Sequence, residues 1–497
     1  MTLVKKLLGL VRKANSPNSR RTYRPMVDTL EDRRLLAVFF VDDDFGDDDP
    51  GRRRYDTIQE AVDVARRGDT IRVAPGLYNE SVTVNKKLTL TGAFATGNPD
   101  RPDDDHASDP ERASIVDPTG DFGIGFNLIA NDIVVQGFTV GNGGFSEDEY
   151  GDDEEYEGNG GISLADTDSV GILVANTTTG NKIRNNVIQD QTIGIYLNSS
   201  TATRNSGSSK STQVIGNTIR DNNTPGSSAG SGIYSDQGLR NAKIVGNRFF
   251  GHENVAINLT GGTVENPLIQ SKITISGNVL QDDSTIRLVN TRDSSVIGNV
   301  SDRSLFNGIE LAGGNSKVTI KGNVLRDGGG GNEASEGGGF TGINLVPDFF
   351  GNALGPNTRI TIQGNLVTGF SGSGIRLRAE TNNSLVKGNV VLNNGDEESL
   401  DFGEGFGNGI TLETGAFDNR VESNTVKNNL RHGIFADETT EDNLIQSNFS
   451  LDNGLPPDGF DYHDHSEGDG TAGTANKYKR NKGRTDDPDG LIQFRVD

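Results

Sequence analysis

The 497-residue chain contains no cysteine, no tryptophan and only two methionines. Without cysteine it has no disulfide, no thiolate nucleophile and no thiolate metal ligand, and cysteine usage does not indicate its redox compartment. Apolar residues make up only 32% of the chain, and no apolar run reaches the roughly 18 residues of a membrane-spanning helix. These shortages argue against large helical cores and against a helical membrane protein.

Glycine and short strand-like runs are plentiful instead. The chain has 66 glycines, and brief Val/Ile/Leu runs alternate with Gly and Asn turn signals. Such runs are typical of many short strands. The composition therefore predicts an elongated all-β protein.

The net charge of −23 is unevenly distributed. Residues 1 to 34 hold nine Lys/Arg against three Asp/Glu, so the remainder carries a net −29. A surface this acidic repels phosphate backbones, so we expect no nucleic-acid partner. It can hold cations or keep the protein soluble.

The basic N-terminus points to export. Its apolar stretch LLGLV is too short for an ordinary secretory signal, but LEDRRLLA, Leu30 to Ala37, resembles an N-terminal sorting segment of secreted and surface proteins in some environmental bacteria. We therefore expect residues 1–37 to be a sorting segment that is disordered or cleaved, and the protein to be secreted or held at the cell surface. The alternative is a frayed basic tail.

One repeat organises the chain from about residue 180. Each unit has a short apolar strand, a Gly-Asn bend, a second strand and then Gly-Ile-x-Leu. Steps of 10 residues from Asn to Ile and of 14 from Ile to the next Asn recur, which makes a unit of 24 residues with insertions. The repeated asparagines are Asn186, Asn217, Asn247, Asn278, Asn299, Asn323, Asn365, Asn389, Asn424 and Asn448.

A period near 24 with three short strands predicts one turn of a parallel β-helix. Turns stack at about 4.8 Å, so like residues form ladders along the coil. Asparagine at the bend is expected to adopt left-handed dihedrals and to bond to the asparagines above and below. A propeller or sandwich would need longer regular hairpins.

These repeats resemble the right-handed parallel β-helix repeats of the pectate-lyase-like superfamily, including NosD-type proteins. The segment TIQEAVDVARRGDTIRVAPGLYNESVTVNKKLTLTG, Thr57 to Gly92, is similar to the N-terminal entry of these proteins, where a short amphipathic helix caps the first coil. The segment from Asp461 to Leu491 is similar to their C-terminal cap. The resemblance covers roughly residues 38 to 497, and it specifies a fold rather than an activity.

The expected organisation follows from this resemblance. We expect a sorting segment at 1–37, an N-terminal cap with the first coils at 38–92, a β-helix with loop insertions at 93–460 and a C-terminal cap at 461–497. The repeats predict about 12 or 13 coils in a monomeric rod of roughly 60 Å. Capped ends prevent end-to-end association.

By the same resemblance, polysaccharide would bind on the face of the Gly-Ile-x-Leu strands. Ile and Leu of each strand point inward, so the x position points outward. The outward column is Tyr196, Tyr234, Asn258, Arg287, Glu310, Asn344, Arg376, Thr411 and Phe435. A second column two residues further along holds Asp236, Arg378, Glu413 and Asp437.

The insertions favour the same face. They lie next to the Gly-Ile-x-Leu strands, whereas the Asn bend receives almost none. Loops clustered beside one face of a regular scaffold build the walls of a cleft. The insertions are 141–160, 198–212, 224–231, 260–271, 328–340, 346–358 and 393–408.

The two columns suggest chemistry for acidic sugars. Tyr196, Tyr234 and Phe435 suit stacking on sugar rings, and Arg287, Arg376 and Arg378 suit uronate carboxylates or sulfates. Asp236, Asn258, Asn344 and Glu413 complete the expected substrate-binding set. Glu310 and Asp236 suit Ca²⁺ binding or acid–base work.

A lyase-like enzyme would use Arg376, Arg287, Glu310 and Arg378 as its catalytic set, because β-elimination needs a neutralised uronate and a base. A hydrolase needs two carboxylates about 5 to 9.5 Å apart. Glu310 and Glu413 lie three coils apart, or roughly 14 Å. Arg287 and Glu310 are also on neighbouring coils, so a purely structural ion pair is the alternative.

Catalytic motifs of related enzymes are incomplete. GLYNE, Gly76 to Glu80, matches the first motif of pectin methylesterases, and QDQT, Gln189 to Thr192, loosely resembles the second, but the catalytic aspartates and arginine are missing. DYHDHSEGD, Asp461 to Asp469, has metal-binding residue types, but a C-terminal cap accounts for most of it. The acidic runs 146–158 and 41–51 lack the spacing of a calcium loop. The metal therefore stays unassigned, with Ca²⁺ as the expected candidate.

Two functional hypotheses follow. The first is an exported, carbohydrate-directed β-helix with an acidic polysaccharide or cell-surface glycan as partner, either lyase-like or purely binding. The second is a structural or adhesive surface protein whose rod only presents loops.

Overall fold

The computed structural model describes residues 36–46, 49–94, 105–118, 123–141, 169–199, 210–261, 269–329, 340–347, 354–397, 401, 403–454 and 459–496. The chain divides into two units, Met1–Leu36 and Ala37–Asp497. The predicted sorting segment 1–37 therefore lies almost wholly outside the described residues.

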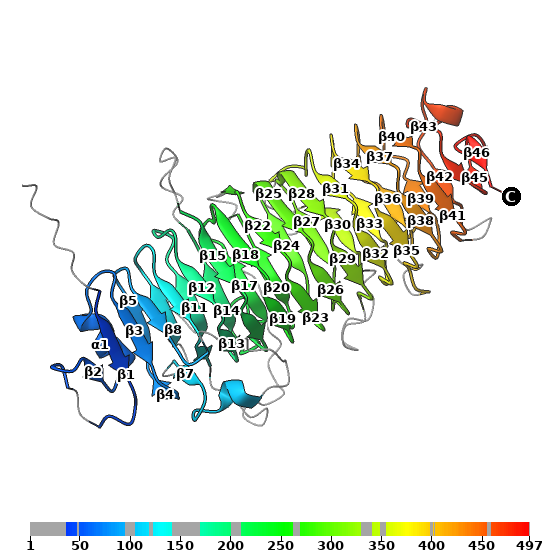
Figure 1. Cartoon of the computed structure of the whole chain (residues 1–497). Coiled ribbons are helices and arrows are strands. Elements are labelled where there is room, and N and C mark those ends of the chain that lie inside the picture. The colour runs from blue at the N-terminus through cyan, green and yellow to red at the C-terminus, as the bar shows by residue number, and fades with distance from the viewer. Residues whose placement is uncertain are drawn as a thin grey trace, which may run out of the picture. The chain divides into compact units, whose positions relative to one another are not determined.

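Three long parallel sheets form the second unit (Figure 1), with 17, 15 and 14 strands in its described parts. Sheet A runs from β1 (Val38–Val41) to β43 (Lys477–Lys479), and sheet B from β4 (Gly76–Asn79) to β46 (Phe494–Arg495). Sheet C consists of β5 (Val82–Val84), β8 (Ile124–Leu128), β11 (Val170–Val174), β14 (Ile193–Leu197), β17 (Ser231–Ser235), β20 (Val255–Leu259), β24 (Ile286–Val289), β27 (Ile309–Ala312), β30 (Ile343–Val346), β33 (Ile375–Leu377), β36 (Ile410–Leu412), β39 (Ile434–Ala436), β42 (Tyr462–Asp464) and β45 (Asp486–Asp487).

One coil passes once through each sheet. For example, β34 (Leu385–Lys387) in sheet A is followed by β35 (Val390–Leu392) in sheet B and then by β36 in sheet C. Each strand pairs in parallel with its counterpart one coil away. The predicted parallel β-helix is confirmed.

Side chains along each strand point alternately inward and outward, and the inward ones fill the interior. Val386, Val391, Ile410 and Leu412 point inward and are completely buried. They belong to one continuous core that runs from Phe39 to Ile492. Because most inward positions are apolar, the short strands are stabilised by stacking on neighbouring coils rather than by their own length.

The asparagine ladder is also confirmed, with one correction. From Asn186 to Asn448, the backbone N–H and side-chain amide of each asparagine donate to the side-chain oxygen of the next, at 2.9–3.3 Å. The left-handed residue is the one before each asparagine, such as Gly388 (φ 61°) before Asn389, and not the asparagine itself. Glycine pays no steric cost there, which explains the Gly-Asn pairing.

A second corner, between sheets B and C, carries a similar ladder of Asn394, Asn429 and Asn453. Nearer the N-terminus His252 and Asp283 take its place, fully buried, with Nδ1 to Oδ2 at 2.7 Å. Asn222 approaches the other ring nitrogen at 3.0 Å. Buried polar groups at this corner are thus paired with each other.

The N-terminal cap contains α1 (Ile58–Val64), which buries Ile58, Ala61 and Val62 against the first coils. Glu80 accepts hydrogen bonds from the backbone N–H groups of Ile58 (2.7 Å) and Gln59 (2.9 Å), so its carboxylate caps the helix. The Glu of GLYNE is therefore a structural residue here. Gln189 of QDQT likewise bonds to Ser108 and Arg220.

We expect Glu80→Ala to lower the free energy of unfolding by about 2 kcal/mol, because two N–H donors at the helix start lose a charged acceptor. Denaturant unfolding measures this. Glu111→Ala, at an exposed position, is the matched control and should stay within about 0.5 kcal/mol of wild type. An equal effect of both substitutions would contradict the capping role.

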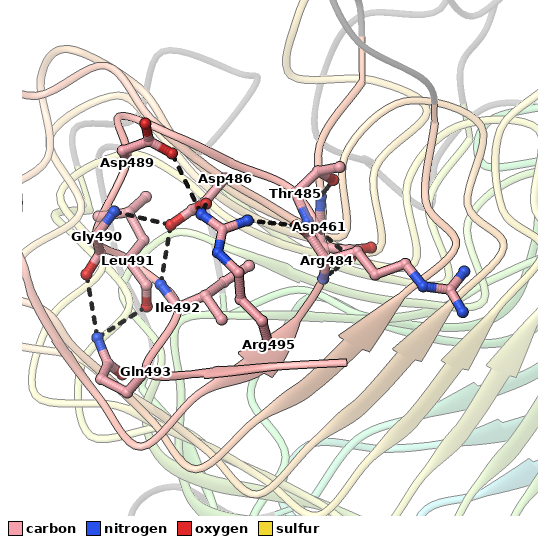
Figure 2. A network of polar contacts seen from close by, with 10 residues as sticks. All are labelled: Asp461, Arg484, Thr485, Asp486, Asp489, Gly490, Leu491, Ile492, Gln493 and Arg495. Atoms are coloured by element: carbon pink, nitrogen blue, oxygen red, sulfur yellow. Dashed lines mark hydrogen bonds and ion pairs between the residues drawn. The ribbon is translucent and has the colours of Figure 1, made fainter. Parts of the chain in front are cut away.

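The C-terminal cap closes the last coil through the network in Figure 2. Asp486 accepts from the backbone of Gly490 (2.9 Å) and Ile492 (3.1 Å) and binds Arg495 at 2.6 Å. Gln493 accepts from the backbone N–H of Asn481, the last asparagine of the ladder, at 3.0 Å. The cap thus supplies the acceptor that another coil would have supplied.

The number of coils is higher than predicted. Sheet C has 14 strands in the described residues, against the predicted 12 or 13. Its last member, β45, belongs to the C-terminal cap, where no Gly-Ile-x-Leu pattern marks a strand. The repeat therefore undercounts the coils at the C-terminal end.

Candidate functional site

The predicted outward column forms one straight ladder across sheet C. The register pairs each member from Tyr196 to Phe435 with the next one along the sequence. The ladder also extends beyond the prediction, to Leu173 and Asn127 at one end and to His463 and Asp487 at the other.

Six of the seven insertions begin or end within about three residues of a sheet C strand, as predicted. The seventh, 141–160, follows β10 (Thr139–Val140) of sheet B and lies almost wholly outside the described residues. Large parts of them, including the acidic run 146–158, lie outside the described residues. The column itself is not open. All of its members except Arg287 are buried. The expectation that this face is open is therefore wrong wherever described segments cover the strands.

The centre of the candidate site is a cluster of two arginines and one glutamate. Arg376 and Arg378 both form ion pairs with Glu413, Arg378 through Nε at 2.8 Å. Arg376 is 3% exposed, and the side chain of Arg378 is 29% exposed. The cluster therefore carries one positive charge in excess, with Arg378 as its accessible part.

Two residues of the segment 403–408 cover this cluster. The ring of Phe406 lies 3.9 Å from the guanidinium carbon of Arg376, a cation–π contact. Gly405 lies so close that a Cβ there would meet Glu413 Oε2 at 2.2 Å, so a larger residue would have to displace the Glu413 carboxylate. Arg431 donates to the carbonyl of Gly403 at 2.7 Å and helps to hold the segment down.

Two opposing effects act on the pKa of Arg376. Burial, and secondarily Arg378, lowers the pKa of Arg376, whereas Glu413 raises it. A lowered pKa is the direction that an arginine base would require. The direct ion pair with Glu413 favours the charged form, which binds anions.

Arg287 and Glu310 form a pair of a different kind. Arg287 Nε donates to Glu310 Oε1 at 2.7 Å, and the Asn307 amide donates to Oε2 at 2.7 Å. Both carboxylate oxygens are therefore engaged within the protein. This is the geometry of the structural ion pair that the sequence left open as the alternative.

Tyr196, Tyr234 and Asp236 meet near the N-terminal end of the column. The tyrosine rings lie 5.6 Å apart, and the Tyr196 hydroxyl donates to Asp236 and accepts from Gln237 at 2.8 Å. Burial raises the pKa of Asp236 and raises that of Tyr234 to about 12. The cluster thus offers neutral hydroxyl groups beside a carboxyl group.

Several buried polar atoms on the ladder have no hydrogen-bond partner among the residues that the structure describes. They share the outward side of sheet C, and two of them, on Asn344 and Arg376, lie on adjacent coils. They are Asn127 Oδ1, Asn258 Oδ1, Asn344 Oδ1, Arg376 Nε and His463 Nε2. Native proteins leave few such atoms unpaired, and water or a ligand normally explains those that remain.

At the C-terminal end of the ladder, His432, His463 and His465 gather around Phe435. His463 lies 4.4 Å from His432 and 4.1 Å from His465, between ring centroids. Asp461 and Asp464 of the same motif bond to neighbouring cap residues, among them Arg484 and Tyr478. Among the described residues, no group of three or more His, Asp or Glu side chains is arranged to hold a metal ion.

The histidines predict a pH dependence. Burial lowers the pKa of His432 to about 2 and that of His463 to about 4, so the folded protein excludes protons that the unfolded chain accepts below about 6.5. The contribution of these neutral histidines to the free energy of unfolding is thus fully present above about pH 6.5. It is lost as the pH falls towards 4, by about 1.4 kcal/mol per pH unit for each imidazole.

We expect His432→Phe to flatten this slope between pH 7 and 5, which denaturant titrations at each pH measure. Lys479→Ala, on the exposed side of sheet A, is the control and should keep the wild-type slope. Equal slopes for all three proteins would contradict the assignment.

Sequence reasoning missed Phe406, Asn307, His432 and His463 as members of the site. Phe406 lies in an insertion with no repeat to place it. Asn307 and His432 directly precede the Gly-Ile pair of their strands and carry no signal of their own. His463 was recoverable, because it continues the column one coil beyond Phe435.

Comparison with known families agrees with this architecture. Residues 348–485 match the family model described as "Right handed beta helix region". The chain therefore folds as a right-handed parallel β-helix. No curated protein matches the chain in sequence.

Solved β-helix structures resemble the chain only distantly. The surface adhesin PfbA of Streptococcus pneumoniae shares 14% identity over 79% of this chain and 86% of its own, with a TM-score of 0.41. DFA-IIIase from Arthrobacter chlorophenolicus A6 shares 15% over 82% and 94% (TM-score 0.45), and a mutant of the periplasmic alginate epimerase AlgG shares 11% over 84% and 77% (TM-score 0.41). Similarity at this level says nothing about the activity of this β-helix protein.

Proposed function

We propose that this β-helix protein is exported and binds an acidic polysaccharide along the outward side of sheet C. The observation that carries the proposal is the row of unpaired buried polar atoms on that side. Leaving such an atom unsatisfied costs about 1 to 3 kcal/mol. A glycan strand supplies hydroxyl and ring oxygens at regular intervals, and coils about 4.8 Å apart present their side chains at regular intervals too.

The arginine cluster gives the proposal its charge preference. Arg376 and Arg378 share one carboxylate, so the cluster holds one uncompensated positive charge in a chain of net charge −23. The overall charge repels polyanions, so binding there depends on this local group rather than on a general basic surface. A carboxylate or sulfate monoester of the glycan would restore neutrality.

Lyase-like turnover is the finer form of the proposal. Arg378 would neutralise the uronate carboxylate, and Arg376 would complete the site once the segment 403–408 moved aside. Glu310 is tied to Arg287 and Asn307, and so it contributes to the scaffold of the face rather than to proton transfer. A dependence on Ca²⁺, with Asp236 as the protein ligand, is a separate proposal.

Affinity electrophoresis in gels containing polygalacturonate, alginate or a sulfated glycan tests binding, with and without Ca²⁺. Retardation by an acidic polymer but not by dextran is the expected result. Ultraviolet absorbance of unsaturated uronates in the same mixtures tests lyase activity. Absence of retardation on every polymer would contradict the proposal.

A structural or adhesive surface protein is the second candidate. The saturated Arg287–Asn307–Glu310 group favours it, because those charges stabilise neighbouring coils without any ligand. Such a protein would adhere to cells through its loops and ignore soluble polymers. Cell-binding assays alongside the electrophoresis separate the two candidates.

A further inference from the structure

The proposed face ends at a side chain that the sequence offered only as part of a metal-like motif. His463 follows Phe435 on the ladder and precedes Asp487. It is 6% exposed, and its Nε2 atom is buried without a hydrogen-bond partner. Its ring packs against those of Phe435 and Phe460, at 5.7 and 5.0 Å between centroids.

Hydrogen bonds fix which nitrogen of His463 carries the proton. The backbone N–H of Phe460 points at His432 Nδ1 at 3.2 Å, and an N–H group only donates. His432 Nδ1 is therefore an acceptor, and the proton of the neutral ring sits on Nε2. That Nε2–H faces His463 Nδ1 at 3.1 Å, so His463 accepts there and carries its own proton on Nε2.

The Nε2–H group of His463 lies beside an exposed carboxylate. Asp487 Oδ2 is 3.3 Å from it, but their arrangement does not form a hydrogen bond, and the Asp487 side chain is 56% exposed. A donor and an acceptor are thus held side by side at the end of the face. A hydroxyl group, which accepts one hydrogen bond and donates another, is the ligand group that satisfies both.

We propose that His463 and Asp487 form a hydroxyl-binding subsite for the glycan at the C-terminal end of the sheet C face, with His432 as the positioning residue. The inference rests on the proposed function and extends the binding face past Phe435. The other charged groups around the rings are Arg431, His465 and Glu404, and His465 contacts Glu404 at 3.2 Å. None of them contacts the Nε2 side of His463 within hydrogen-bond distance in the described residues.

The fixed tautomer is measured without any ligand. Long-range ¹H–¹⁵N spectra of ¹⁵N-histidine-labelled protein at pH 7 should show His463 and His432 protonated at Nε2. The single variants His463→Phe and His432→Phe identify the two signals. His432→Phe should also leave His463 in a mixture of both tautomers, whereas a His463 ring protonated at Nδ1 in wild type would overturn the inference.

Binding of polygalacturonate tests the ligand. His463→Phe keeps the ring packing but removes the donor, and it should weaken binding about tenfold, as should His432→Phe. Lys479→Ala is the matched control on sheet A and should bind like wild type. Different binding results would contradict the subsite and the proposed function.

Binding by His463→Phe that equals wild type, while Arg376→Ala loses it, would overturn the subsite and leave the proposed function standing. Wild-type protein that binds no acidic polymer would overturn the proposed function and with it the glycan as ligand. If His463→Phe does not fold, the tautomer of wild-type His463, and Asp487→Ala with an expected loss of binding, still decide the inference.

Discussion

Replacing Asn389 with alanine is expected to lower the free energy of unfolding by about 4 kcal/mol. Asn389 Oδ1 accepts from the backbone N–H and the side-chain amide of Asn365, both at 2.9 Å. Its own amide donates to the Ile362 carbonyl at 3.0 Å and to Asn424 Oδ1 at 3.0 Å. All three asparagines are buried, so water cannot replace the lost partners.

The loss of stability comes from the buried donors that no longer have an acceptor, rather than from the removal of the Asn389 side chain itself. Two donors of Asn365 would remain buried without an acceptor, at about 1 to 3 kcal/mol each. The break would also fall in the middle of the ladder, where it uncouples coils on either side.

Denaturant unfolding measures this effect through the transition midpoint. Asn79→Ala is the control, because Asn79 lies on an exposed position of β4, and it should change stability by less than about 0.5 kcal/mol. A midpoint for Asn389→Ala equal to that of the control would show that the ladder does not hold the coils together.

Replacing Arg376 with alanine is expected to weaken binding of acidic polysaccharide by about a hundredfold or more. Arg376 is buried against Phe406 and paired with Glu413, and its loss leaves Arg378 as the only partner of that carboxylate among the ion pairs of the described residues. The site then has no positive charge in excess. It would no longer attract a uronate or a sulfate.

Arg376→Lys separates charge from geometry. Lysine keeps the positive charge but loses the planar guanidinium that stacks on Phe406, so we expect intermediate binding. Arg326→Ala is the matched control: Arg326 lies on β29 (Val324–Arg326) of sheet B, where it pairs with Asp302 at 3.3 Å. It should bind like wild type, and a folded Arg376→Ala protein that also does so would remove Arg376 from the site.

The fold could be predicted because each coil repeats the same pattern of alternating apolar residues and bend residues. Ile375 and Leu377 alternate with Arg376, so sequence alone placed two side chains inward and one outward. The Gly-Asn bend marked most turns from sheet A to sheet B. The left-handed residue was misassigned because either member of a Gly-Asn pair can adopt positive φ, and the ladder bonds that decide the matter join residues 21 or more positions apart.

The candidate site could be predicted only in part. The ladder from Tyr196 to Phe435 followed from the period, but its covering did not, since Gly405 and Phe406 belong to an insertion. Arg287 and Arg376 also occupy equivalent positions in the repeat, so the sequence did not show that their carboxylate partners have different surroundings. Glu310 has Asn307 as a second partner, whereas Glu413 has two arginines, and the contact with Asn307 does not follow from the repeat.

Hydrogen exchange of the protein with and without polygalacturonate tests the central claim most directly. The account predicts slower exchange of the sheet C strands from β14 to β42 and of the segment 403–408, with the exposed strands of sheets A and B unchanged. Protection confined to sheet A or sheet B, with sheet C unaffected, would contradict the account.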